Sequence, residues 1–459
     1  MHGTYDGHAL RPSRRSVLLG AAGVIAGGSL TAPPARAEPH SAASVQESLR
    51  RATGFLGAML DAYPDVNGSG PRLAQSYADE LGLFSTAFVY DNALAICAAL
   101  AADDVDLARA AGDGLLFAQQ HDPAYGDGRL RQAYNVGPYV FYDGSPQPYG
   151  LAMPDGSANI AWQFGFLGTA VGDMAWPGIA LVRLYRRTGD ERYLRGALAI
   201  AGWITDRAES TGSLGGFAFG VTGDDRPIPN VSTEHNVDCV GFFGQLAAAT
   251  GDDSWREKAG HARDFVERMW DPTGGFFYTG SNDGDTVNRS PLPLDPQTWS
   301  WLALRERRFA RCLDWAAAEL AATDSSDQPT SQLPEGVSVS GVTFSSASLT
   351  STAAYNGTTV HPTGVWLEGT AQLACSMGDR SWGGHDRRLV TSLLEQVAVA
   401  QRVLGAGQHV GGRPLPPSSG VVAASSLIDT GFGFGYFPVQ HVGASAWYVM
   451  AGSGVNPLR

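Results

Sequence analysis

One pattern recurs along the chain: an apolar helix, a short turn, and a second helix that carries more charge. Residues 176–208 and residues 236–270 follow this pattern, and their turns lie 62 residues apart. The two units share a Thr-Gly-Asp turn and a later Gly-Gly-Phe loop, at 188–190 and 215–217 in the first and at 250–252 and 274–276 in the second. A repeated helical hairpin cannot bury its apolar face alone, so neighbouring hairpins must stack.

Three further segments fit the same template, at residues 85–120, 297–322 and 364–404. The two ends supply single helices, an amphipathic one at 43–62 and an apolar one at 441–452. We expect these two helices to pair and close a ring of six hairpins. The sequence therefore predicts an all-α (α/α)6 barrel, with the apolar helices inside and the amphipathic helices outside.

The Ser/Thr/Gly-rich stretch at 323–363 has two interpretations, a linker between two domains or a long loop within one. The hairpin pattern resumes directly after it, which favours the loop, and loops of this length are usually functional. We predict a single toroid domain over residues 38–459. The loops at 125–161 and 323–363 are expected to set its specificity.

The first 37 residues have the features of a twin-arginine export signal. Arg14 and Arg15 precede an apolar, Gly- and Ala-rich run, and a small-x-small cleavage site follows at 35–37. The run is about 15 residues long, short of the ~20 that span a bilayer. We expect a mature protein outside the cytoplasm, with no membrane attachment after the signal is removed.

Charge narrows the range of partners. The chain has 32 basic and 45 acidic residues, and residues 1–37 hold four of the arginines and one aspartate. The mature chain thus has 28 basic against 44 acidic groups, a net charge of −16. This charge repels a nucleic-acid backbone and makes a neutral polysaccharide a better substrate than an acidic one.

Four cysteines lie singly at Cys97, Cys239, Cys312 and Cys375, without metal-ligand spacing. We expect neither a metal nor another cofactor. Free buried thiols are favoured over disulfides, because most of these cysteines lie in apolar helical stretches.

The inner helices of such a ring all begin at the same end, so the residues at their starts converge. Those starts carry acids, amides and aromatic rings beside the apolar helix interiors, at Tyr90, Asp91, Glu234, His235, Asn236, Asp238, Asp295, Gln297, Trp299, Trp366, Glu368, His441 and Trp447. Glycan chemistry needs two carboxyl groups for acid and base steps, and flat apolar rings that stack on sugars. Acids in a first helical turn also stabilise the helix dipole in any protein, so one acid alone indicates little.

Glu234 and Asp238 form the most specific pair, because residues four apart share one helical face. Two carboxyl groups so close raise the pKa of one of them, which suits a general acid. We predict Glu234 as the acid, with Asp238 tuning it, and Asp91 or Glu368 as the base. Substrate-binding roles are predicted for His235, Asn236, Asp295, Gln297, Trp299, Trp366, Tyr90, His441 and Trp447.

Several motifs resemble the six-hairpin glycosidase superfamily, in particular its bacterial members. They are Thr-Glu-His-Asn-Val-Asp at 233–238, Gly-Val-Trp-Leu-Glu-Gly-Thr-Ala-Gln at 364–372, Tyr-Asp-Asn-Ala-Leu at 90–94, and the closing Ala-Trp-Tyr at 446–448 with Asn-Pro at 456–457. The resemblance covers nearly all of the mature chain. It implies an (α/α)6 toroid with a carbohydrate-active site at its mouth, and it leaves the reaction open because the superfamily includes hydrolases, lyases and epimerases.

The leading hypothesis is a glycoside hydrolase that cleaves a neutral poly- or oligosaccharide by paired-carboxylate catalysis. The first alternative is a polysaccharide lyase on the same toroid, with a Tyr or His base and with Arg129 and Arg131 neutralising a uronate. An epimerase would leave the chain length of the substrate unchanged. A non-catalytic glycan-binding protein would keep the groove and lack a working acid pair.

Overall fold

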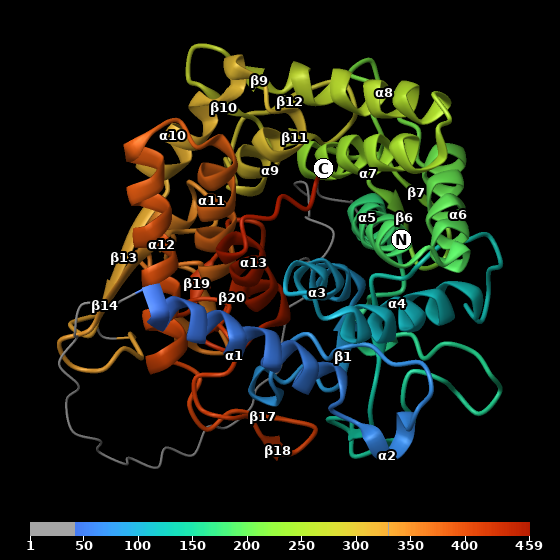
Figure 1. Cartoon of the computed structure of the whole chain (residues 1–459), viewed down its shortest axis with the longest axis horizontal. Coiled ribbons are helices and arrows are strands. Elements are labelled where there is room, and N and C mark those ends of the chain that lie inside the picture. The colour runs from blue at the N-terminus through green and yellow to red at the C-terminus, as the bar shows by residue number, and fades with distance from the viewer. Residues whose placement is uncertain (1–41, 329) are drawn as a thin grey trace, which may run out of the picture.

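Six apolar helices meet at the centre of the molecule and contact one another in a closed circle (Figure 1). The computed structural model describes residues 42–328 and 330–459, so the predicted export signal at 1–37 lies outside the described residues. The inner helices are α3 (Val89–Ala101), α5 (Val171–Thr188), α7 (Thr233–Thr250), α9 (Asp295–Leu304), α11 (Leu367–Arg380) and α13 (Val442–Gly452). Each contacts the next, and α13 contacts α3.

Outside each inner helix lies an outer helix that packs on it. The outer helices are α4 (Val105–Gln120), α6 (Glu191–Arg207), α8 (Ser254–Arg268), α10 (Arg311–Glu319), α12 (Gly384–Val403) and α1 (Ala42–Leu60). Five of them follow their inner partners in the chain, whereas α1 packs on α13 from the other end of the sequence. The predicted (α/α)6 barrel is confirmed, including the pairing of its first and last helices.

The two rings differ in how much of each helix they bury. Every residue of α3 from Val89 to Ala99 is buried, because inner helices are enclosed on all sides. In α8 only Ala262, Phe265 and Val266 are buried, a single stripe at helical spacing.

The strands are short, antiparallel and confined to the loops. Two-stranded ribbons are formed by β1 (Thr86–Phe88) with β2 (Ala133–Asn135), β3 (Tyr139–Val140) with β4 (Pro146–Gln147), β9 (Trp270–Asp271) with β10 (Phe276–Phe277), β13 (Ala321–Ser325) with β14 (Ser338–Val342), β15 (Ala354–Tyr355) with β16 (Thr358–Thr359), β17 (His409–Val410) with β18 (Arg413–Pro414), and β19 (Ile428–Asp429) with β20 (Gly435–Tyr436). Three-stranded sheets are formed by β5 (Thr169–Ala170), β6 (Gly220–Val221) and β7 (Pro227–Ile228), and by β8 (Val231–Ser232), β11 (Gly280–Ser281) and β12 (Val287–Asn288).

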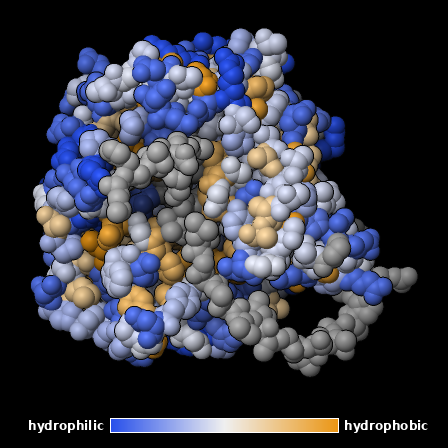
Figure 2. Space-filling view, turned by 180° about the vertical axis from the view of Figure 1, so that it is seen from behind, coloured by the Kyte–Doolittle hydropathy of each residue, from blue (hydrophilic) through white to orange (hydrophobic). Residues whose placement is uncertain are grey.

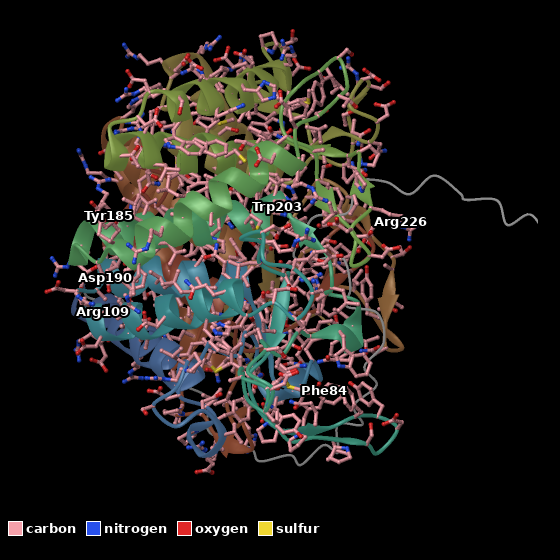
Figure 3. The ribbon with its side chains drawn as sticks, turned by 90° about the vertical axis from the view of Figure 1, so that its right-hand side faces the viewer. Phe84, Arg109, Tyr185, Asp190, Trp203 and Arg226 are labelled. Atoms are coloured by element: carbon pink, nitrogen blue, oxygen red, sulfur yellow. The ribbon has the colours of Figure 1, made fainter. Side chains whose placement is uncertain are left out.

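Several of these strands lead directly into inner helices, so the strand-bearing loops gather where those helices begin. β1 ends at the start of α3, β5 at the start of α5, and β8 at the start of α7. Figure 3 shows this polarity from the side: Tyr185 and Asp190, near the far end of α5, lie at one edge, and Phe84 and Arg226 lie at the opposite, loop-bearing edge.

One side chain in the first turn of each inner helix accepts a hydrogen bond from a backbone N–H of an earlier loop. The six pairs are Asn92 with Ala74, Met174 with Leu130, Asn236 with Phe217, Gln297 with Phe277, Thr370 with Val342, and Ser445 with Val421. Satisfying a buried N–H in this way fixes each loop against its helix end. The loops at this end of the ring therefore have a defined position over the inner helices.

The long segment at 323–363 packs onto the ring. Its β13–β14 hairpin contacts α10, α11 and α12. Asp324 on β13 is fully buried and accepts hydrogen bonds from the hydroxyls of Ser425 and Ser426, at 2.7 and 2.6 Å. These contacts tie the segment to a loop about a hundred residues later in the chain.

All four cysteines are free and buried, as the sequence predicted. Burial raises the pKa of Cys97 to about 11 and that of Cys375 to about 12, and it also raises the pKa values of Cys239 and Cys312. Since the thiolate is the reactive form, we expect no reaction of the native protein with Ellman's reagent at pH 8. The same assay in guanidinium chloride should count four thiols, and rapid labelling of even one thiol in the native protein would contradict the prediction.

Candidate active site

The acids predicted from the sequence come together at the end of the ring where the inner helices begin. Asp91, Glu234, Asp295 and Glu368 lie in the first turns of α3, α7, α9 and α11. All four are buried, with exposed fractions of 2, 5, 0 and 0%. Figure 2 shows the molecule from this end. Four buried carboxyl groups from separate hairpins thus lie at the same end of the ring, and His441 contacts two of them, Asp91 and Glu368.

Glu368 is held by hydrogen bonds from two helices. The Tyr90 hydroxyl on α3 donates to Glu368 Oε1 at 2.7 Å, and Gln372 Nε2, one turn along α11, donates to the same oxygen at 3.3 Å. The indole N–H of Trp447 on α13 donates to the Tyr90 hydroxyl at 3.0 Å. Donors of this kind favour the ionised form of a carboxyl group and fix its orientation.

His441 lies between Asp91 and Glu368. It is the N-cap of α13, where its Nδ1 accepts the backbone N–H of Ala444 at 3.3 Å, so the ring hydrogen lies on Nε2. Nε2 lies 3.2 Å from Asp91 Oδ1 and 3.3 Å from Oδ2, and Nδ1 lies 3.7 Å from Glu368 Oε2. The ring is also stacked on Tyr77, with centroids 4.1 Å apart and planes at 5°. His441 therefore connects α3, α11 and α13 at the site.

On α7 the remaining predicted residues are Glu234, His235 and Asp238, all buried. The hydroxyl of Ser232 caps the helix by accepting the backbone N–H of His235 at 3.4 Å. The His235 ring packs against Phe219, with centroids 4.9 Å apart. Glu234 and Asp238 stand one turn apart on this helix, the arrangement that the sequence predicted.

Aromatic side chains fill the ring beside the acids. Trp176 lies 5.2 Å from Trp299 and 5.7 Å from Trp447 between ring centroids, and Tyr90 lies 5.5 Å from Trp176. The three tryptophans are fully buried. Trp366, also buried, packs on Phe344 and Tyr436 instead. These rings lie beside the acids and pack mainly on one another.

Asn236 and Gln297, which the sequence predicted to bind substrate, form hydrogen bonds with loop backbone. The amide of Asn236 bonds to the backbone N–H and carbonyl of Phe217 and to the Ser232 carbonyl, and the amide of Gln297 bonds to the same two groups of Phe277 and to the Pro293 carbonyl. An amide with these backbone partners has little capacity left for a ligand, so the predicted role of both residues in direct substrate binding is replaced here by a structural one. Asn236 and Gln297 hold the loops around the site.

Arg129 and Arg131 do not provide cations for a uronate substrate. Arg129 pairs with Asp127 at 2.6 Å and with Asp225 at 2.8 Å, and Arg131 pairs with Asp122. Both guanidinium groups are buried, and the same contacts lower the pKa values of the three aspartates despite desolvation. This pairing removes the feature that favoured a polysaccharide lyase.

Sequence reasoning missed Gln372 and Tyr77. Gln372 had a usable signal, because it follows Glu368 by four residues on a predicted helix. Tyr77 had none, since it lies in a loop whose path depends on tertiary contacts. In the described part of the chain, no group of three or more His, Cys, Asp or Glu side chains is placed to hold a metal ion, and no helix is long and apolar enough to cross a bilayer.

Comparison with known proteins gives matches in structure alone. No protein-family model matches the chain, and no curated protein matches it in sequence. A cellobiose 2-epimerase from Bacillus thermoamylovorans B4167 shares 12% identity and a TM-score of 0.56, over 89% of this chain and 98% of that one. A D-mannose isomerase shares 12% identity and a TM-score of 0.57, over 91% and 97%.

A family 76 glycoside hydrolase from a bovine Bacteroides thetaiotaomicron strain shares 12% identity and a TM-score of 0.53, over 89% of this chain and 78% of that one. At such identities the likeness is one of fold, and the toroids that match include both hydrolases and sugar isomerases. The chain therefore has the (α/α)6 fold that these hydrolases and sugar isomerases share.

Proposed function

We propose that this protein is a glycoside hydrolase that cleaves a neutral poly- or oligosaccharide by paired-carboxylate catalysis. The observation that carries the proposal is that Glu234, Asp91 and Glu368 are buried in the first turns of three inner helices, which are not neighbours in the ring and begin at the same end of it. Hydrolysis of a glycosidic bond needs one carboxylic acid and one carboxylate on either side of it. A glycoside hydrolase among the structural matches supports the same chemistry.

In this proposal Glu234 protonates the leaving oxygen, and Asp238 one turn away keeps it protonated by like-charge repulsion. Glu368 is the base, because Tyr90 and Gln372 donate hydrogen bonds to its carboxyl group and fix its orientation. Asp91 positions His441, which lies against Glu368.

The proposal includes the cellular location and the charge of the substrate. The twin-arginine pattern before residue 37 favours export to a compartment where the enzyme would meet polysaccharides. The net charge, −13 for the full chain and −16 for the expected mature chain, favours a neutral glycan. The test is a screen for reducing-sugar release from a panel of neutral glycans, with the Glu234→Gln variant as the blank. Release by the parent protein and none by the variant supports hydrolysis, and no release from any glycan contradicts it.

A sugar epimerase or isomerase is the second candidate, and two histidines favour it. His235 and His441 are both buried at the starts of α7 and α13, which lie three places apart in the ring of six. Such reactions move a proton off and onto a sugar carbon, for which two bases on opposite sides are suited. Incubation of mono- and disaccharides in D2O separates the candidates: a new isomer carrying deuterium, without release of a sugar, indicates the epimerase.

We expect Tyr90→Phe to lower turnover about tenfold, with its folding unchanged, because Glu368 loses a hydrogen-bond donor. Losing that donor destabilises the carboxylate and raises the pKa of Glu368, so the acidic limb of the pH–rate profile should move to higher pH. The control is Tyr193→Phe, which removes a Tyr–carboxylate bond to Asp113 on the outer ring. An unshifted profile for Tyr90→Phe would show that Glu368 is not the base.

A further inference from the structure

Aromatic side chains gather on the loops at the acid-bearing end of the ring, outside the site described above. This aromatic shelf consists of Phe84, Tyr139, Phe141, Tyr142, Trp162 and Phe164. Tyr142 is 60% exposed and Trp162 is 57% exposed. Figure 3 places Phe84 on the loop-bearing side of the molecule. Rings this large that stay in water mark a surface that binds something.

The shelf is built rigidly. Phe84 stacks on Tyr139 with centroids 4.6 Å apart and planes at 6°, and it also contacts Tyr142 at 4.8 Å and Phe164 at 5.7 Å. The Tyr142 hydroxyl donates to the carbonyl of Gly82 at 2.8 Å, which fixes the exposed ring. Phe84 has φ of 53°, a left-handed conformation that a bulky residue avoids. The chain adopts this unfavourable backbone at the residue on which the other rings stack.

Ring contacts connect the shelf to the acids. From Phe164 they run to Phe166 at 6.1 Å and on to Phe88 at 4.8 Å, the residue before α3. Phe88 contacts Tyr77 at 6.4 Å, and Tyr77 stacks on His441. The shelf is therefore packed, through the buried rings of Phe166, Phe88 and Tyr77, onto the His441 side of the site.

The chemistry of the shelf selects its ligand. Flat rings bind the C–H face of a sugar by stacking, without any charge on the ligand. A nucleic acid would also stack, but its phosphates would be repelled by a chain with a net charge of −13. A neutral sugar unit fits both observations.

We propose that the aromatic shelf binds sugar units remote from the bond at the acids, so that the substrate is a neutral oligosaccharide or polysaccharide of several units. This inference rests on the proposed function, since it places the reacting sugar at the acid-bearing end of the ring. A free monosaccharide would occupy the acids alone and leave Tyr142 and Trp162 unused.

Calorimetric titration tests the shelf without turnover. The protein is the full chain carrying Glu234→Gln, and the probes are maltohexaose, cellohexaose, laminarihexaose and mannohexaose, with glucose and mannose as single units. For whichever hexasaccharide binds, Trp162→Ala should raise the Kd about tenfold, the loss expected for one stacked ring. Trp162→Phe should restore most of the affinity. The matched control is Trp382→Ala, because Trp382 is 48% exposed at the other end of the ring, just beyond α11.

Unchanged hexasaccharide binding in Trp162→Ala overturns the proposal, and so does a parent protein that binds none of the four hexasaccharides. If Trp162→Ala weakens the binding of glucose or mannose as much as that of the hexasaccharide, the proposal is also overturned, because the shelf should contact only the longer ligand. Sedimentation velocity tests whether a second copy of the protein binds the shelf instead. Self-association that Trp162→Ala abolishes would make the shelf an interface between copies and overturn the proposal. If the wild-type protein releases no reducing sugar yet hexasaccharide binding depends on Trp162, hydrolysis is wrong and the shelf stands.

Discussion

Replacing Glu234 by Gln is expected to lower turnover of a cleavable glycan by about 10³-fold, within the range of general acid catalysis. The substitution keeps the size of the side chain and its place in the first turn of α7, and it removes the proton that the leaving oxygen needs. Sugar binding should remain, since Gln can still form hydrogen bonds. The measurement is kcat and KM for the best substrate of the neutral glycan panel, with circular dichroism to show that the fold is intact.

The matched control lies on the outer helix of the same hairpin. Glu257 is in the first turn of α8 and exposed, so Glu257→Gln makes the same chemical change away from the site. Turnover of this variant should equal that of the wild type. Full activity in Glu234→Gln would remove Glu234 from the mechanism, whereas a raised KM with unchanged kcat would make it a binding residue.

Much of the ring could be predicted from the sequence because hairpins are local. The Thr-Gly-Asp turns at 188–190 and 250–252 end an inner helix and begin an outer one, through Gly189 and Gly251 in the left-handed conformation. Local composition also shows whether a helix is buried on all sides or along one stripe. It therefore distinguished the inner helix α3 from the outer helix α8. The shared rim then followed from topology, since successive inner helices must begin at the same end.

Helix starts were predicted less well, because they depend on contacts between distant segments. The sequence indicated an inner helix from Trp176, with Pro177 in its first turn, whereas α5 begins at Val171 and contains Pro177. Asp173 lies in the first turn of α5, where Gln132 donates to it at 3.2 Å.

The role of a polar side chain at a helix start could not be predicted from its type. Glu234 and Asn236 are two residues apart in one motif, yet the amide of Asn236 is used by the backbone of a loop. Which backbone groups need a partner is decided by the loop path, and a sequence pattern does not show that path. The same holds for Gln297, whose partner loop surrounds Phe277.

Replacing Leu56 by Asp on α1 is expected to abolish cooperative folding of the whole chain. Leu56 is fully buried, and α1 packs on α13, although these helices lie at opposite ends of the sequence. Their approach is close: a side chain at Gly452 would meet Leu49 at 2.5 Å, and the Tyr448 hydroxyl donates to Ser48 at 3.0 Å. An unpaired buried charge costs several kcal/mol, comparable to the whole stability of a typical domain at about 5–15 kcal/mol.

The control for this prediction is Gln46→Asp, which adds the same charge to the exposed face of α1. It should unfold in urea with the wild-type midpoint, while Leu56→Asp should show no cooperative transition by tryptophan fluorescence. The signal is suitable because Trp447 on α13 packs beside Trp176 and Trp299. A wild-type transition in Leu56→Asp would mean that five hairpins and α13 fold without α1. In the closed ring, α13 carries His441 and supports Tyr90 through Trp447, so loss of α1 should also disorder the contacts of Glu368.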